Sequence, residues 1–186
     1  MCIRDSLIRL FVGGSLLGAL VFLMPPLYGE GFVTIKQLLS GNYNSLVNDT
    51  IFYDFKDNLM IMLILILGLA LFKVVATAVT IGAGGIGGVF APSLFVGATT
   101  GFLFSKAMNF FGMAKLSESN FTLVGMAGLI AGVLHAPLTA LFLIAEITSG
   151  YELIIPLMIT VAIAYLTSKY FAVSYTHLTL PTNSLV

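Results

Sequence analysis

The residues best suited to binding chemistry lie between Gly82 and Pro92, in a segment of glycine, alanine and apolar residues. An apolar stretch follows the proline, and proline is favoured in the first turn of a helix. The first N–H groups of a helix have no partner within it, and the positive end of its dipole points the same way. Such a helix start attracts an anion without any basic side chain, so the segment predicts a main-chain anion site.

Two interpretations of this glycine segment remain open. Glycine lets the backbone approach a small ion without interference from a Cβ atom, and partial charges would hold the ion weakly enough for it to leave again. A glycine-rich loop can equally be only a tight packing point or a hinge. An unwound backbone cannot face lipid, so we expect the loop to be buried in protein or to line an aqueous cavity.

Composition indicates that a membrane surrounds this segment. The chain has 186 residues, 59% hydrophobic and 9% charged, and its mean hydropathy is +1.07. Soluble domains carry about 25% charged residues, and disordered chains are poor in apolar residues, so both classes are excluded. The formal net charge of zero argues against a nucleic-acid partner, because nothing could neutralise a run of phosphates. The single cysteine excludes a disulfide framework and a cysteine metal cluster.

Apolar stretches long enough to cross a bilayer, about 20 residues each, predict an all-α polytopic membrane protein with broken and re-entrant helices. The fourth stretch is broken at His135-Ala136-Pro137, because proline removes a backbone donor and clashes with the preceding turn. In the third stretch, Gly97 and Gly101 form a pair of small residues that allows close helix packing. The candidate stretches are residues 7–24, 58–81, 93–112, 120–148 and 151–170.

A more polar region, residues 30–57, separates the first two stretches. Four apolar residues recur there at helical spacing, namely Phe32, Ile35, Leu38 and Leu39. This spacing predicts a short amphipathic helix near the membrane interface, followed by a loop.

The two ends of the chain, residues 1–6 and 173–186, resemble translated adapter sequence from transposase-based sequencing libraries. The start reads as ATG TGT ATA AGA GAC AG, and the end reads as the reverse complement running into the adapter tail. Segments of this kind belong outside the fold. We therefore expect the protein's own sequence to cover residues 7–172, cut at both ends, with no function for Cys2, Tyr175 or His177.

The glycine segment also carries a specific family resemblance. Gly88-Val89-Phe90-Ala91-Pro92 matches the G-x-F-x-P motif of the chloride channel and chloride–proton antiporter (CLC) family, and residues 82–95 are similar to that family throughout. Residues 124–128, 135–140 and 145–158 also resemble the family, in the same order. The resemblance implies that the N–H groups of Val89 and Phe90 face a central anion and that the Phe90 ring narrows its path. Gly88 and Pro92 would shape the turn, and Ala91 lies within it.

The resemblance covers nearly all of residues 7–171 and implies the C-terminal half of the family's transmembrane unit, one inverted repeat of two. The family's serine loop (G-S-G-I-P) and glutamate loop (G-K/R-E-G-P) belong to the other half, and neither occurs here. The resemblance implies a homodimer in which each subunit has its own pore, chloride or a similar small anion as substrate, and a fragment that does not conduct without the missing N-terminal half. Channel and proton-coupled exchanger both remain open, because the gating and proton glutamates would lie upstream.

Three polar side chains within or between the apolar segments have competing interpretations. Lys73 is costly in a span and could be functional, although we favour a place near one membrane face from which it snorkels. Glu146 could relay protons, but in the family pattern its position is structural, near a helix end. His135 could titrate near neutral pH, and we favour a polar loop residue at a membrane face.

Two other function classes remain as alternatives to anion transport. A cation-coupled secondary transporter of a carboxylate substrate could use a similar broken helix, and a membrane-embedded assembly subunit would not transport at all. The sequence carries no metalloprotease, phosphate-loop or nucleophile-elbow motif, so we expect no enzyme activity, no cofactor and no metal. We expect a multi-pass protein of the membrane lipid bilayer, specifically the bacterial plasma membrane.

Overall fold

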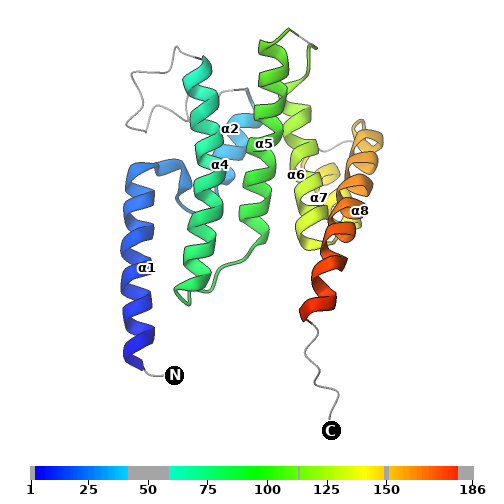
Figure 1. Ribbon diagram of the computed structural model, residues 1–186. Coiled ribbons are helices and arrows are strands. Elements are labelled where there is room, and N and C mark those ends of the chain that lie inside the picture. The colour runs from blue at the N-terminus through cyan, green and yellow to red at the C-terminus, as the bar shows by residue number, and fades with distance from the viewer. Residues whose placement is uncertain (1–2, 42–58, 113, 149–150, 180–186) are drawn as a thin grey trace. The chain divides into compact units, whose positions relative to one another are not determined.

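The computed structural model of the protein describes residues 3–41, 59–112, 114–148 and 151–179. Within these ranges the regular structure is helical throughout, as the sequence predicts (Figure 1). The chain divides into two compact units, Met1–Met126 and Ala127–Val186, each with its own packed helices.

The first unit opens with helix α1 (Ile3–Leu23) and the 3-10 helix η1 (Pro25–Leu27). The first predicted span therefore ends at its prolines, since a proline suits a first turn but not a helix interior. Helix α2 (Phe32–Leu39) follows, with Gly31 as its N-cap at φ 82°. A positive φ of this size favours glycine, because a Cβ atom makes the conformation strained.

Helix α2 confirms the predicted short helix, and its place near the membrane interface stays a prediction. The structure buries Ile35 and Leu38 and packs α2 against the helix that begins at Phe90. The predicted loop after this helix falls largely on residues 42–58, outside the described residues.

Helices α4 (Leu59–Gly82) and α5 (Phe90–Phe110) form the centre of this unit. α1 and α5 both pack on α4, and α2 packs on α5 (Figure 1). α4 matches the predicted second span closely. α5 starts slightly earlier than predicted, because Pro92 lies within its first turn instead of preceding the helix.

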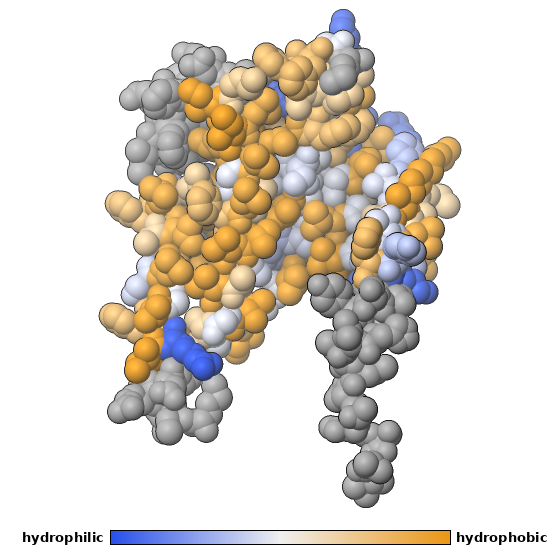
Figure 2. All heavy atoms as spheres, in the orientation of Figure 1, coloured by the Kyte–Doolittle hydropathy of each residue, from blue (hydrophilic) through white to orange (hydrophobic). Residues whose placement is uncertain are grey.

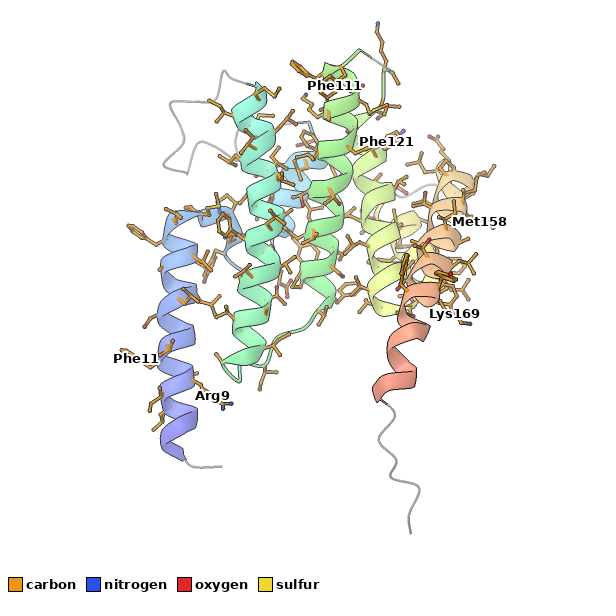
Figure 3. The ribbon with its side chains drawn as sticks, viewed as in Figure 1. Arg9, Phe11, Phe111, Phe121, Met158 and Lys169 are labelled. Atoms are coloured by element: carbon orange, nitrogen blue, oxygen red, sulfur yellow. The ribbon has the colours of Figure 1, made fainter. Side chains whose placement is uncertain are left out.

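Close contact between glycines joins α5 to helix α6 (Glu118–Leu134). A Cβ atom added to Gly97 would lie 2.6 Å from the carbonyl oxygen of Gly125, and one added to Gly101 would collide with the carbonyl of Phe121. Phe121, labelled in Figure 3, stacks on Phe104 with 5.7 Å between ring centroids. The predicted small-residue pair therefore does pack closely, and its partner on α6 is itself a glycine.

Three polar contacts join the end of α5 to the start of α6 and the residues just before it. The side-chain amide of Asn109 donates to the carbonyl oxygen of Leu116 at 2.9 Å, and its oxygen accepts from the Leu116 N–H at 2.7 Å. Lys106 and Glu118 form an ion pair at 2.7 Å. These contacts therefore hold the end of α5 to the start of α6.

The second unit contains the end of α6, helix α7 (Pro137–Ile147) and helix α8 (Ile154–Thr179). The predicted helix break is confirmed, since α6 ends at Leu134 and α7 begins at Pro137. α7 packs on α8, and the Ser168 hydroxyl donates to the carbonyl oxygen of Gly132 at 2.6 Å.

Apolar side chains also cover outward surfaces of the protein. Figure 2 shows them gathered over α1 and α4, and Phe11, which is 78% exposed, points outward from α1 in Figure 3. The stretches Met60–Gly82 and Ile154–Phe171 are long and apolar enough to cross a membrane. A surface of this kind suits lipid or other protein, and not water.

Candidate anion site at the start of helix α5

The glycine segment leaves helix α4 through a tight turn. The N–H groups of Ala83, Gly84 and Gly85 donate to carbonyls in the last turns of α4, at 2.8, 3.1 and 2.9 Å. Gly84 has φ +88°, and a Cβ atom added to Gly85 would lie 2.9 Å from the carbonyl oxygen of Thr80. Glycine is therefore required where the chain turns back on α4, and the following residues run unwound to Val89.

The backbone amides at the start of α5 have no hydrogen-bond acceptor among the described residues. The first hydrogen bond that closes the helix runs from the N–H of Ser93 to the carbonyl of Val89 at 3.0 Å. Pro92 has no N–H, so the amides left over belong to Val89, Phe90 and Ala91. These are three of the five residues that the sequence singled out, and the structure places all five together at one helix start.

The glycine segment and the first turns of α5 contribute no side-chain charge to this helix start. No Asp, Glu, Lys or Arg occurs between Gly82 and Ser105, and the first turn of α5 carries no acidic residue. The Ser93 hydroxyl donates back to the carbonyl oxygen of Phe90 at 2.7 Å. The partial positive charge of the helix N-terminus is therefore not cancelled by a carboxylate of the same segment, which is the condition for attracting an anion.

The loop itself is not enclosed by the described part of the chain. Val89 and Phe90 are 44% and 38% exposed, and the glycines from Gly84 to Gly88 are also exposed. We expected a loop that is buried in protein or lines a cavity. The described residues of the first unit pack around the body of α5, with Ser93, Phe95 and Ala98 buried, and leave Val89 and Phe90 exposed at its start.

Lys73 does not snorkel as we expected. Its side chain is only 4% exposed, and its Nζ donates to the carbonyl oxygens of Leu27 at 3.0 Å and Gly29 at 2.7 Å. Nζ also lies 5.1 Å from the centre of the Phe95 ring. The lysine points into the protein because the turn around η1 offers carbonyls that no helix uses, and sequence periodicity gives no signal for contacts so far apart along the chain.

The other two polar candidates lie away from helix α5 in the sequence and are exposed. His135 adopts φ 55° in the break between α6 and α7, and its ring meets that of Tyr165 edge-on at 6.1 Å. Glu146 lies in the last turn of α7. Both positions agree with the structural interpretations that we favoured, a polar loop residue and a residue near a helix end.

Comparison with known proteins gives a family match and several relatives of similar sequence. The family described as "Voltage gated chloride channel" matches residues 2–169. A ClcB-like chloride channel protein from Ralstonia nicotianae is 33% identical over 163 residues, which are 87% of this chain and 34% of that protein. The H(+)/Cl(-) exchange transporter ClcA of Vibrio parahaemolyticus is 31% identical over 157 residues, which are 82% and 30% of the two chains.

A further relative has a channel name instead of an exchanger name. The voltage-gated ClC-type chloride channel ClcB of Escherichia coli is 30% identical over 162 residues, which are 87% of this chain and 34% of that protein. The chain thus spans about a third of the length of these curated relatives. Both channel and exchanger names occur among proteins of comparable similarity.

Proposed function

Because the chain belongs to the voltage-gated chloride channel family, we propose that it carries one anion site of a protein that moves chloride across a membrane. The amides of Val89, Phe90 and Ala91 bind the ion, while Gly88 and Pro92 shape the backbone around it. The observation that carries the proposal is the helix start of α5, whose amides have no acceptor among the described residues. The names of the relatives, which include channels and an exchanger, support chloride as the substrate.

The proposal includes the remainder of a longer protein. The exposed loop at Val89 needs covering before an anion can be held out of contact with lipid, and the relatives are about three times as long as the segment that they share with this chain. We propose that an N-terminal half of the same protein covers the loop, that the complete subunits form a homodimer, and that they reside in a bacterial plasma membrane. Residues 7–172 are proposed to be the protein's own sequence.

Removal of a single amide tests the site. Val89 has φ −82°, close to the value that proline adopts, so Val89→Pro deletes one N–H with little change in backbone conformation. A hydrogen bond to a charged group contributes about 1.5–3 kcal/mol, and its loss should weaken chloride binding by roughly tenfold to a hundredfold. Val89→Leu keeps the amide and should bind chloride as the wild type does.

The measurement uses the full-length gene product in liposomes, with chloride efflux recorded at graded chloride concentrations. The pH of the lumen is followed in the same experiment, so that proton movement distinguishes an exchanger from a channel. Equal half-saturating chloride concentrations for Val89→Pro and Val89→Leu would refute the site. Absence of any anion flux from the wild type would refute the function.

A further inference from the structure

Lys73 is buried at a point where three separate elements meet. It comes from α4, its two carbonyl acceptors Leu27 and Gly29 belong to η1 and the turn after it, and the ring that it faces belongs to Phe95 of α5. An ammonium has three N–H donors and no acceptor. Two of them are used by carbonyls, and the ring lies within the range of about 6 Å at which a cation and an aromatic face attract each other.

A second contact ties the same turn to the same ring. A Cβ atom added to Gly31 would collide with the Phe95 side chain, so the backbone of the turn rests directly on that ring. Phe95 itself is fully buried. Phe95 is therefore in contact with Gly31 and close to the Lys73 ammonium at the same time.

Phe95 lies five residues after Phe90 on one continuous helix, which is about 7.5 Å along the axis at a rise of about 1.5 Å per residue. Over so short a distance, the residues of a continuous helix move together as one rigid segment. Any shift of Phe95 relative to α4 is thus passed to the first turn of α5, where the free amides are.

We propose that Lys73 is a positioning residue for the anion site, which holds the first turn of α5 in place by joining the Leu27–Gly29 turn to the ring of Phe95. The inference rests on the proposed function, because it concerns the same amides. Lys73 does not contact the anion in this arrangement, since its donors face the carbonyls and the ring. Its effect on transport passes through the placement of α5.

The test compares three variants of the full-length protein in liposomes. Lys73→Met removes the ammonium but keeps an apolar stem, Lys73→Arg keeps a buried cation with donors, and Lys36→Met removes an exposed lysine of α2 as a matched control. The readouts are the half-saturating chloride concentration and the ratio of chloride to nitrate flux. Both report on site geometry, and neither depends on the fraction of protein that is folded.

We expect Lys73→Met to raise the half-saturating chloride concentration roughly tenfold and to change the chloride-to-nitrate flux ratio. The reason is that a displacement of about 1 Å in groups that must be precisely placed can have effects of this size or larger. Lys73→Arg should restore both values to within about twofold of the wild type, because arginine also brings donors and favours aromatic faces. Lys36→Met should match the wild type.

A second variant keeps the inference testable if Lys73→Met fails to fold. Phe95→Leu removes the ring face, keeps a buried apolar side chain and leaves the charge in place, and it should shift both readouts in the same direction. Unchanged readouts in Phe95→Leu, or in a folded Lys73→Met, would overturn the positioning role alone. A wild type that neither binds nor moves chloride would overturn the proposed function instead.

Discussion

At the start of α5 the proposed chemistry is carried by backbone atoms and not by side chains. The amides of Val89, Phe90 and Ala91 are available because of what their neighbours lack: Pro92 has no N–H, and the glycine segment contributes no charge. Partial charges of this kind bind an anion weakly enough for it to be released, which conduction requires. A lysine such as Lys73 would hold the ion far more strongly, and the structure directs its ammonium to carbonyls instead.

The glycine contact between α5 and α6 gives a prediction for a single-residue substitution. Gly101→Ala places a Cβ atom against the carbonyl of Phe121 and near the Cα of Gly125, so the helices must separate. Overpacking of this kind costs about 1–3 kcal/mol, and the melting temperature of the full-length protein in detergent should fall by several degrees. Thermal unfolding followed by intrinsic fluorescence measures the change.

Gly68→Ala is the matched control for this prediction. Gly68 lies within α4, where an added Cβ atom would meet only ordinary contacts, the nearest at 3.9 Å. Alanine also stabilises a helix interior relative to glycine by about 1 kcal/mol. The control should therefore match or exceed the wild-type melting temperature. A Gly101→Ala protein that melts with the control would show that α5 and α6 are not in close contact.

Among the elements, several boundaries were predictable from a proline or a glycine, although α5 begins before Pro92 and not after it. Pro25, Pro137 and the glycines after α4 mark changes of direction that follow from missing donors and from backbone freedom, and the helices end and begin there. Packing partners were not predictable in the same way. The burial of α2 and the carbonyl acceptors of Lys73 depend on contacts between residues far apart in the sequence, which hydrophobic periodicity does not report.

The same distinction applies to the candidate site. Local sequence was enough to predict a helix start with free amides near Val89, because that feature depends only on neighbouring residues. Enclosure of the loop was also expected, and the described residues do not provide it. The residues that surround a loop can come from any part of a protein, so a local pattern cannot name them.

The break between α6 and α7 leads to a prediction about an element boundary. His135 adopts φ 55°, a region that β-branched residues rarely enter and that costs ordinary L-residues about 1–2 kcal/mol. His135→Val should lower the free energy of unfolding by up to about that amount, whereas His135→Asn, which tolerates this conformation, should have little effect. Chemical unfolding of the two variants in detergent compares them directly, and similar midpoints would mean that the break has a different backbone conformation.

At the scale of the whole molecule, two surfaces of the first unit lack partners among the described residues. One is the exposed apolar surface of α1 and α4, to which Phe11, Phe22 and Ile64 contribute, each more than 60% exposed. The other is the exposed glycine loop around Val89. Lipid can cover the apolar surface, but it cannot satisfy the polar backbone of an unwound loop. The loop is therefore the feature that requires further protein.

This requirement predicts that residues 7–172 alone, inserted into liposomes, release chloride no faster than protein-free liposomes. Co-expression with the N-terminal part of the same gene should restore efflux, because the added chain would enclose the loop and complete the path. The amide site can then be separated from mere assembly: Val89→Pro in the co-expressed fragment should co-purify with the N-terminal part yet need a higher chloride concentration for half-maximal efflux. Chloride release by the fragment alone would contradict this prediction, since the helix start of α5 would then form a path without any covering protein.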